Sequence, residues 1–262
     1  MPADDAWAPL AGRFVDGHYG TLRGRVRTHV IAAHLHDHLP RPPAGLVDIG
    51  GGAGNQSIPL ARAGYRVTIV DPSEAMLARA RTRLAGEPGE VAGRVRLVQA
   101  SAAGAREALG GARFAGVLCH GVIMYVEEPR PFVAALADLA EPGGIISLVA
   151  KNARVLAARP ALAGDWAEAL AAFDTDHQVN GLGVDTRGDT VEDLTVMLAG
   201  HGVQRIAWYG VRLFTDGWTR ASGEDGGAGE LACEVELQAS RRDPYRLMSR
   251  LFHIVGRRAA GH

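Results

Sequence analysis

The residues with the clearest chemical potential are acids and glycines that follow the first two runs of apolar residues. Asp48, Gly50, Gly52 and Gly54 occupy every second position after the first run begins, and Asp71 ends the next run. Glycines let a backbone turn sharply and approach a ligand where a Cβ would clash. An acid at the tip of the second strand is placed to accept hydrogen bonds from ribose hydroxyls. The pattern therefore predicts a nucleoside site at the carboxyl ends of two neighbouring parallel strands.

The spacing of the glycines indicates which nucleoside binds there. A dinucleotide fingerprint starting at Gly50 needs a glycine where Asn55 stands, and no Gly-Lys-Ser/Thr of a P-loop follows. The pattern that remains, Asp-x-Gly-x-Gly-x-Gly over residues 48–54 with Asp71 downstream, resembles motif I of the class I S-adenosylmethionine-dependent methyltransferases. Their cofactor has an amino-acid tail in place of phosphates, so a carboxylate such as Asp48 beside the glycines does not repel it.

Other segments carry a second, narrower resemblance. They are Tyr-Gly-Thr-Leu-Arg-Gly-Arg-Val-Arg at 19–27, Asp-Ile-Gly-Gly-Gly at 48–52, His-Gly-Val-Ile-Met-Tyr-Val at 120–126, residues 147–152, Gly-Val-Arg-Leu-Phe at 210–214, and Asp-Pro-Tyr at 243–245 leading to His253. Together they resemble the tRNA 5-carboxymethoxyuridine methyltransferase (CmoM) family, which esterifies the side-chain carboxylate of a wobble uridine. Carried over by position, the resemblance implies that Arg27, Gly51, Gly52, Asp71, Ala102 and His120 contact the cofactor.

The sequence departs from that family at two places. Ala53 replaces an acid in the glycine loop, and Met124-Tyr125 replaces the usual Glu-Trp after His120. The first change concerns the pocket for the cofactor tail and the second concerns the substrate mouth. We therefore expect S-adenosylmethionine as the cofactor, and either a tRNA or a small carboxylate-bearing metabolite as the methyl acceptor.

Within this family fold, each predicted cofactor contact has a part of the cofactor to face. The glycines would face the amino-acid tail, Asp71 the ribose, and Arg27 the tail carboxylate through its bidentate fork, unless Arg27 lies on a solvated helix face. Pro72 and Met76 would flank the nucleoside, and Ser101-Ala102 would meet the adenine ring. The full set of predicted cofactor contacts is Tyr19, Arg27, Asp48, Gly50, Gly51, Gly52, Asp71, Pro72, Met76, Ser101, Ala102 and His120.

Three residues are candidates for the chemistry itself. A carboxylate acceptor is ionised at neutral pH and needs no general base, so a cation that holds it in line is sufficient. Arg212 is the candidate for that cation, and the alternative is a structural ion pair at the end of its strand. His120 follows the fourth strand and either acts as a general base or packs on the cofactor. Tyr125 either stacks on the substrate or closes the core.

The elements that position these residues alternate between strands and helices. Apolar runs at 46–49, 67–70, 95–98, 116–119, 145–149 and 205–211 predict strands, with 253–255 as a final edge strand. Runs of this kind separated by amphipathic helices predict a doubly wound, mostly parallel seven-stranded α/β sheet of the Rossmann-like methyltransferase type. Ser73 is a predicted helix cap, and 231–240 and 244–252 are predicted helices.

The irregular stretches suggest how one domain is organised. We expect one methyltransferase domain over 1–262, with an N-terminal helical segment at 1–40 over the cofactor. Residues 152–188 combine an alanine-rich helical piece with a polar loop from 174 to 188, which is typical of an inserted cap or lid. The loop at 222–229 is rich in glycine and is expected to be mobile.

Composition excludes several classes of protein. The chain has 262 residues, 47% hydrophobic and 22% charged residues, and a formal net charge of −1, which predicts no global attraction to DNA or anionic membranes. No signal peptide or membrane-length apolar run is present, so a cytoplasmic location is expected. Cys119 and Cys233 have no metal-ligand spacing. His177 with Asp174 and Asp176 is interpreted as part of a solvated polar loop in preference to a metal site, so no metal is expected.

Two rival functions remain open at this stage. The first is a small-molecule O-, N- or C-methyltransferase on the same fold, and the second is a non-catalytic cofactor-binding partner subunit. A tRNA substrate would require clustered cations for its phosphates. The candidate cations are Arg23, Arg25, Arg154, Arg159, Arg241, Arg242, Arg246, Arg250, Arg257 and Arg258.

Overall fold

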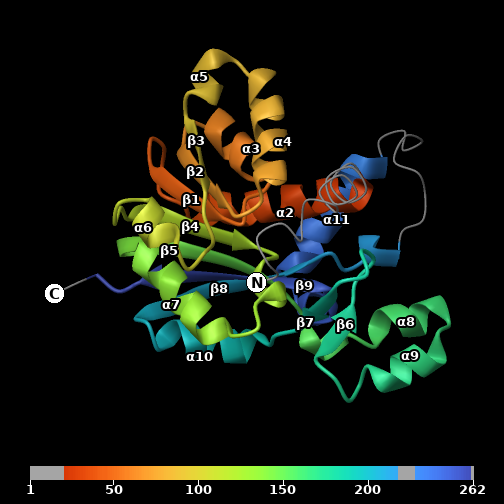
Figure 1. The fold of residues 1–262 in the computed structure, drawn as a ribbon. Helices are drawn as coiled ribbons and strands as arrows, with labels where there is room; N and C mark the ends of the chain where they lie inside the picture. Colours follow the sequence, from red (N-terminus) through yellow and green to blue (C-terminus); the bar gives the residue numbers. More distant parts are fainter. Residues whose placement is uncertain (1–20, 218–227, 261–262) are drawn as a thin grey trace.

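A seven-stranded sheet forms the centre of the protein in a computed structural model that describes residues 21–217 and 228–260 (Figure 1). The predicted cofactor contact Tyr19 and most of the glycine-rich loop at 222–229 lie outside these residues. The strand order is β3-β2-β1-β4-β5-β9-β8, in which all neighbours are parallel except those of β9. The strands are β1 (Gly45–Ile49), β2 (Arg66–Asp71), β3 (Val95–Gln99), β4 (Phe114–His120), β5 (Ala140–Lys151), β8 (Val203–Val211) and β9 (Leu251–Arg258).

The predicted strands and the doubly wound fold class are confirmed, and two predictions near the C-terminus are wrong. Residues 253–255 were expected at an edge, but β9 lies inside the sheet between β5 and β8. Residues 244–252 were expected to be helical, but only η5 (Tyr245–Met248) is a short 3-10 helix before β9 begins. The reason is burial: Phe252, His253 and Ile254 are fully buried, which an apolar run interrupted by a histidine does not reveal.

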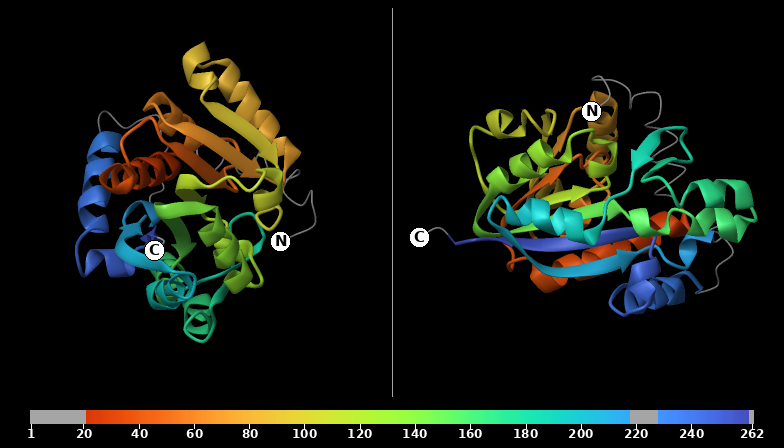
Figure 2. Two further views of the ribbon diagram at one scale, coloured as in Figure 1. Left: turned by 90° about the vertical axis from the view of Figure 1, so that its left-hand side faces the viewer. Right: turned by 90° about the horizontal axis from the view of Figure 1, so that it is seen from below.

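Helices cover both faces of the sheet. On one face α2 (Leu22–His38), α3 (Ser57–Arg62) and α11 (Ala228–Ser240) bury a cluster that includes Val26, Leu46 and Val255. Figure 2 shows α2 and α11 side by side on that face. The other face carries α7 (Pro129–Leu139) and α10 (Val191–Ala199). The remaining helices near the glycine loop are α4 (Glu74–Ala85), α5 (Gly89–Ala92) and α6 (Ala105–Ala108).

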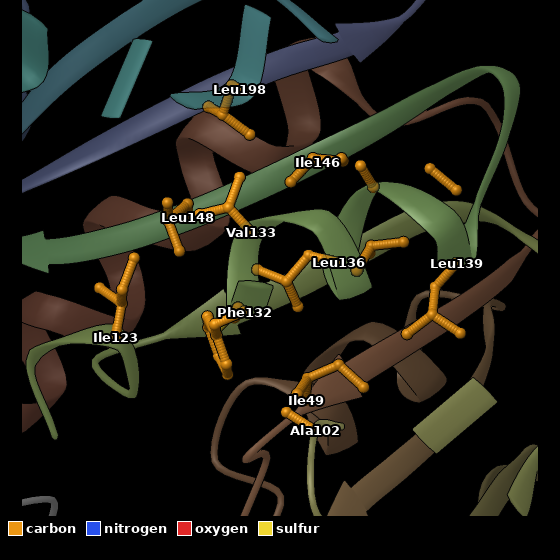
Figure 3. Packing of buried hydrophobic residues seen from close by; sticks show 14 of the residues in the cluster. Ile49, Ala102, Ile123, Phe132, Val133, Leu136, Leu139, Ile146, Leu148 and Leu198 are labelled. Carbon is orange, nitrogen blue, oxygen red and sulfur yellow. The ribbon is translucent and has the colours of Figure 1, made fainter. Parts of the chain in front are cut away.

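The larger core cluster holds the carboxyl ends of the parallel strands in place. In Figure 3, Val133 and Leu136 of α7 lie close to Ile146 and Leu148 of β5, and Leu198 comes from α10. All of these side chains are fully buried. Removing a buried aliphatic side chain of this size typically costs about 2–5 kcal/mol, so this layer gives the strand ends a rigid base.

The predicted helix cap at Ser73 is confirmed, because its Oγ accepts a hydrogen bond from Met76 N at the start of α4. Capping of this kind contributes about 1 kcal/mol. The cap also fixes the chain direction directly after Asp71. The residue that ends β2 is therefore held at the start of a well-defined helix.

The inserted segment between β5 and α10 lies at the end of the sheet (Figure 1). Its alanine-rich part forms η3 (Ala153–Val155), α8 (Ala158–Ala163) and α9 (Trp166–Ala171). The stretch expected as an irregular polar loop contains an antiparallel hairpin of β6 (His177–Val179) and β7 (Asp185–Arg187). Short strands with polar side chains and flanking glycines give little sequence signal.

Within the described ranges, no helix is long and apolar enough to cross a bilayer.

Candidate active site

The glycine loop after β1 is shaped by positions that a larger residue could not occupy. Gly50 and Gly52 have φ of +71° and +53°, a region that favours glycine. A Cβ on Gly52 would lie 2.6 Å from Met76 Cε, and a Cβ on Gly51 would lie 2.8 Å from Asp48 Cγ. The loop is therefore a closely packed backbone cradle between β1 and α4, as the glycine spacing predicted.

Asp71 at the end of β2 ties this loop down. Its Oδ2 accepts a hydrogen bond from Gly52 N at 2.9 Å, and its Oδ1 accepts one from Ser73 N at 2.9 Å. Burial raises the pKa of Asp71, and these two backbone hydrogen bonds oppose that rise. Each carboxylate oxygen has a second lone pair. Asp71 can therefore position the loop and still accept hydrogen bonds from a ribose.

Asp48 lies beneath the same loop in a different environment. It is 3% exposed, and its Oδ2 accepts a hydrogen bond from Ser57 Oγ at 2.6 Å. Burial raises the pKa of Asp48 to about 6, while the bond from Ser57 acts in the opposite direction. Arg27 also lowers this pKa, so its guanidinium is near enough to act on the carboxylate.

Arg27 and His120 meet at the carboxyl end of β4. Arg27 Nη2 donates to the carbonyl oxygen of His120 at 3.0 Å, and the arginine is 5% exposed. The alternative of a solvated helix face is therefore wrong for Arg27. His120 Nε2 lies 2.8 Å from Ser147 Oγ, whereas its Nδ1 is buried without a hydrogen-bond partner among the described residues. A buried polar atom without a partner is a place where a ligand group fits.

Gln56 is a residue that sequence reasoning missed. It directly precedes α3, is 6% exposed, and neither its amide nitrogen nor its amide oxygen has a partner within the described part of the chain. A buried side-chain amide without partners is costly unless a ligand or water satisfies it. The only sequence signal is a polar residue just after the glycines, which is common in turns.

The residues predicted near the nucleoside lie around the ends of β2 and β3. Met76 is buried against Ala53, and Pro72 O accepts a hydrogen bond from Gln99. Ser101 Oγ accepts a hydrogen bond from Gly104 N, and Ala102 is buried in the large core cluster. The backbone and Cβ of Ala102, rather than a polar group, are therefore what this position offers to a flat ring.

Arg212 follows β8 at the same edge of the sheet and is engaged with an acid. Its Nη2 forms a buried ion pair with Asp216 Oδ1, and Arg250 Nε lies 3.9 Å from Asp216 Oδ2. Arg212 Nε and Arg250 Nη1 are buried without hydrogen-bond partners among the residues described. Two guanidinium groups share one carboxylate here, so donors remain for an anionic ligand.

The backbone at Arg212 is also unusual. Its φ is +64°, the left-handed region that residues with a Cβ rarely occupy. Such conformations persist where the surrounding structure imposes them, and they are concentrated at functional sites. The left-handed turn directs the chain from β8 into the segment that contains Asp216.

These arginines line a cavity of about 610 Å³ between the cap and the sheet edge. Arg23 and Arg159 join Arg212 and Arg250 in its wall, and Asp216 is the one acid among its described lining residues. Arg23 lies one turn before Arg27 on α2, and residues four apart on a helix are neighbours. The cavity therefore adjoins the cluster around Arg27, Asp48 and His120. Its apolar wall consists of Val155, Ala158, Leu162, Ala163, Leu213, Phe214 and Met248.

Glu236 of α11 fixes the segment that carries Phe214, and sequence reasoning missed it too. The side chain is 2% exposed and accepts hydrogen bonds from the backbone nitrogens of Leu213, Phe214 and Thr215 at 2.7–2.9 Å. It also accepts one from Thr215 Oγ1 at 2.7 Å. A glutamate in a helix more than 20 residues later in the chain has no local sequence pattern that predicts these hydrogen bonds.

Residues at the end of β5 and after β4 hold the cap, the inserted segment between β5 and α10. Lys151 Nζ donates to Thr186 Oγ1 at 2.8 Å, and burial lowers the pKa of this lysine to about 8. Asn152 Nδ2 donates to the carbonyl oxygens of Leu247 and Ser249. Tyr125 OH accepts a hydrogen bond from Asn180 Nδ2 at 3.1 Å, so the tyrosine contacts the hairpin loop.

His177 lies exposed at the start of β6. Its Nδ1 is 2.6 Å from Asp185 Oδ2, and Asp176 lies nearby. Groups of three or more His, Cys, Asp or Glu side chains suited to a metal ion are absent from the part of the chain that the structure describes.

The C-terminal arginines do not form the patch that one helix face would make. Arg241 and Arg242 follow α11, Arg246 lies in η5, Arg250 directly precedes β9, and Arg257 and Arg258 end β9. Arg257 lies opposite Ile145 of β5, whereas Arg250 lies beside Asn152, just after β5 ends. Most are engaged locally. Arg241 pairs with Asp37, Arg246 with Asp243, and Arg258 donates to carbonyl oxygens. Their number in the sequence is therefore a poor guide to a nucleic-acid surface.

Comparison with known proteins connects this geometry to a family. A protein-family model described as a methyltransferase domain matches residues 47–146. The tRNA 5-carboxymethoxyuridine methyltransferase of Escherichia coli (strain K12) is 27% identical over 252 residues, covering 95% of this chain and 94% of that protein. The ubiquinone biosynthesis O-methyltransferase of Caulobacter vibrioides is 30% identical over 209 residues, covering 76% and 77% respectively.

Solved structures support the fold. The CcbJ methyltransferase from Streptomyces caelestis superposes with a TM-score of 0.60 at 17% identity, covering 89% of this chain and 90% of that one. The matched region holds the glycine loop, Asp71, strands β2 to β4 and parts of β1 and β5. The chain therefore belongs to the class I S-adenosylmethionine-dependent methyltransferases, and S-adenosylmethionine is its cofactor.

Proposed function

We propose that this enzyme methylates an oxygen of an anionic acceptor, with a carboxylate as the acceptor group that its cavity favours. The observation that carries the proposal is the wall of that cavity, which has four arginines and one acid among its described lining residues. Arginine presents a planar fork that matches a carboxylate in two parallel hydrogen bonds. Arg212 Nε and Arg250 Nη1 are the buried donors available for this purpose.

The cofactor would lie between the glycine loop and α2. Gly50, Gly51 and Gly52 would contact its amino-acid tail, with Arg27 at the tail carboxylate and Asp48 and His120 beside the ammonium group. Asp71 would accept hydrogen bonds from the ribose, and Pro72, Met76, Ser101 and Ala102 would surround the nucleoside. The orphaned atoms of His120 and Gln56 and the tight glycine cradle are consistent with this placement.

The chemistry required of the protein is then mainly positioning. When bound, S-adenosylmethionine supplies an electrophilic methyl group on a sulfonium. The arginine-lined cavity would hold the acceptor carboxylate in line with that methyl group, and the cap would exclude water. Because a carboxylate is already ionised at neutral pH, no residue has to remove a proton from it.

The same cavity and the relatives support two candidates for the acceptor molecule. Similarity over nearly the whole chain to a tRNA 5-carboxymethoxyuridine methyltransferase supports a modified uridine whose side chain ends in a carboxylate. The second candidate is a small metabolite. The continuous apolar wall formed by the cap and Phe214 favours it, as does the similarity to ubiquinone biosynthesis O-methyltransferases.

The test uses labelled cofactor with bulk tRNA in one reaction and a metabolite extract in another. Methyl esters are cleaved by mild alkali with release of methanol, whereas methyl ethers and N-methyl groups are stable. We expect alkali-labile label, and alkali-stable label in both reactions would contradict carboxylate methylation. Label in tRNA alone would identify the nucleoside acceptor, and label in the extract alone would identify the metabolite.

A pair of arginine variants tests the cavity. Arg159 lines it, whereas Arg154 lies exposed on the same cap and pairs with Glu192. We expect Arg159→Gln to raise the KM of the acceptor by about 5- to 50-fold, as expected for a hydrogen bond to a charged group, with unchanged affinity for the cofactor. Arg154→Gln is the matched control and should leave both constants near the wild-type values. Equal KM values for the two variants would argue against an anionic acceptor in this cavity.

A further inference from the structure

A chain of buried polar side chains runs from the candidate active site through the sheet face beneath α2 and α11. His120 Nε2 lies 2.8 Å from Ser147 Oγ, which lies 2.7 Å from His253 Nε2. His253 Nδ1 lies 3.1 Å from His34 Nδ1, and His34 Nε2 lies 2.8 Å from Ser240 Oγ. The residues come from β4, β5, β9, α2 and α11. Ser147, His253, His34 and Ser240 are each at most 2% exposed. Five elements far apart in the sequence therefore meet in one hydrogen-bonded line.

The three histidines in this line are held neutral. Burial lowers the pKa of His253 to about 3 and lowers those of His34 and His120 as well. Neighbouring arginines act in the same direction: Arg27 lowers the pKa of His120 and His253, and Arg241 lowers that of His34. The His34 ring also stacks on Tyr209 at 3.9 Å between centroids, which fixes its orientation. Each neutral ring then has one N–H and one lone pair.

The far end of the line sets its direction. Ser240 Oγ donates to the carbonyl oxygen of Leu237 at 2.7 Å, and a carbonyl can only accept. Since the single hydroxyl proton of Ser240 is used there, His34 Nε2 has to donate to Ser240. His34 Nδ1 is then the lone pair, so the proton between the two histidines belongs to His253 Nδ1.

The same reasoning extends to the active site. His253 Nε2 carries the lone pair, so Ser147 Oγ donates to it and accepts from His120 Nε2. His120 is therefore the Nε2–H tautomer, and its Nδ1 carries an unshared lone pair. That Nδ1 atom is the one without a hydrogen-bond partner among the described residues. Every proton in the line points away from the site, and the line ends at an atom that cannot pass a proton on.

We propose that Ser147, His253, His34 and Ser240 are positioning residues that fix His120 in one tautomer, so that Nδ1 accepts a hydrogen bond from an N–H or O–H donor of a bound ligand. The donor is either the ammonium group of the cofactor tail or a group of the methyl acceptor. Burial, His253 and Arg27 lower the pKa of His120, so Nδ1 accepts a hydrogen bond without taking up the donor's proton. The inference takes from the proposed function only that His120 borders the site, and it is independent of which acceptor is methylated.

The tautomers can be measured directly in the full chain labelled with ¹⁵N-histidine. Long-range ¹H–¹⁵N spectra separate protonated from unprotonated ring nitrogens, and His120→Gln assigns the signals of that residue. We expect Nε2–H at His120 and His34 and Nδ1–H at His253, without ligand and across neutral pH. An Nδ1–H at His120 in the wild-type protein would overturn the proposal, whatever the acceptor proves to be.

Ser147→Ala breaks the line beside the active site, and Ser147→Thr is the conservative variant that keeps a hydroxyl. We expect the alanine variant to show mixed tautomers at His120, the threonine variant to restore one tautomer, and His34 to be unchanged in both. A single unchanged tautomer at His120 in the alanine variant would show that the line does not set it. The wild-type spectrum remains decisive if the alanine variant fails to fold.

Ligand affinities then identify the donor. S-adenosylhomocysteine carries the amino-acid tail and 5′-methylthioadenosine lacks it. If the tail ammonium is the donor, Ser147→Ala should weaken S-adenosylhomocysteine by about 3- to 10-fold, the range of a single hydrogen bond, and leave methylthioadenosine unchanged. If the acceptor is the donor, both affinities hold and kcat falls by a similar factor. If Ser147→Ala shows mixed tautomers at His120 but keeps the affinities and kcat of the wild type, the fixed tautomer has no function in binding or turnover.

Discussion

Two aspartates under the glycine loop have separate tasks, and the difference lies in their surroundings. Asp71 accepts two backbone hydrogen bonds that fix the loop, whereas Asp48 is more completely buried and accepts one from Ser57. Burial raises the pKa of Asp71, and the two backbone hydrogen bonds oppose that rise by favouring the ionised form. Asp48 has a folded-state pKa of about 6, so its charge at neutral pH has a cost that a bound cation would offset.

The ribose assignment predicts a loss of cofactor affinity in Asp71→Asn. The variant keeps the size of the side chain but loses its charge and one acceptor oxygen. We expect S-adenosylhomocysteine to bind about 10- to 100-fold more weakly, which corresponds to about 1.5–3 kcal/mol for hydrogen bonds to a charged group. Calorimetric titration measures this, with the exposed Glu74→Gln as the control on the adjoining helix. Equal affinities for the two variants would remove Asp71 from the ribose site.

The raised pKa of Asp48 predicts a pH-dependent stability. The folded pKa is about 6 and the unfolded value is 3.8, so the folded protein holds this proton more tightly. The stability from Asp48 is therefore fully present below pH 3.8 and is lost as the pH rises through 6, by about 3 kcal/mol. Asn resembles the protonated acid. Asp48→Asn should be more stable than wild type by about 2–3 kcal/mol at pH 8, with a difference that shrinks towards pH 4.

Urea unfolding of the ligand-free protein between pH 4 and pH 8 checks this, and the exposed Asp138→Asn is the control. The same variant should bind cofactor more weakly, because the tail ammonium loses a negative partner. A stability difference that is constant over this pH range would show that Asp48 does not titrate as described.

At the scale of single residues, the sequence predicted the members of the candidate site that stand in a recognisable motif or turn. It missed residues that matter only through partners far away in the sequence. Asp71, the glycines and Arg27 were predicted at the candidate site because their spacing or family position places them there. Gln56 and Glu236 were missed because their significance depends on missing or long-range partners. Arg212 was found, but its pairing with Asp216 could only be named as an alternative.

At the scale of elements, α11 is the unexpected contributor to the site. It lies between β8 and β9 in sequence and packs beside α2, so one helix brings both Ser240 and Glu236 under the sheet face. The strands themselves were predictable because buried Val, Ile and Leu runs have few alternatives. The place of β9 was not, because sheet order is set by pairing partners that no local pattern records.

The glutamate on α11 gives a prediction for this element. Glu236→Gln keeps the shape but leaves one acceptor oxygen for four donors, three of them backbone N–H groups of residues 213–215. We expect a loss of about 2–4 kcal/mol in the free energy of unfolding, since buried donors without acceptors are costly. The KM of the acceptor should also rise, because Phe214 lines the cavity.

Glu234→Gln is the matched control for this variant. Glu234 lies on the same helix, is exposed, and accepts a hydrogen bond from Gln238 one turn away. It should unfold at the wild-type denaturant midpoint. Identical midpoints for the two variants would mean that the glutamate does not hold the segment after β8.

At the scale of the whole molecule, the charge distribution limits how a tRNA could bind. The formal net charge is −1, so no overall field draws a polyanion to the protein. The arginines outside the cavity are dispersed over the two ends of the sheet, and many already pair with acids. The wall of the cavity combines four arginines with one acid among its described lining residues.

This distribution predicts a shallow salt dependence for tRNA binding. Arg23 and Arg159 at the cavity, with at most one further cation, would neutralise about two or three phosphates. The slope of log K against log salt should therefore be about −2 to −3. Filter binding of bulk tRNA from 50 to 300 mM salt measures it, and Arg159→Gln should reduce the slope by about one. Turnover of a small carboxylate should change little over the same range. A slope steeper than about −6 would require many more phosphate contacts than the arginines of this cavity provide, and would place the tRNA elsewhere on the molecule.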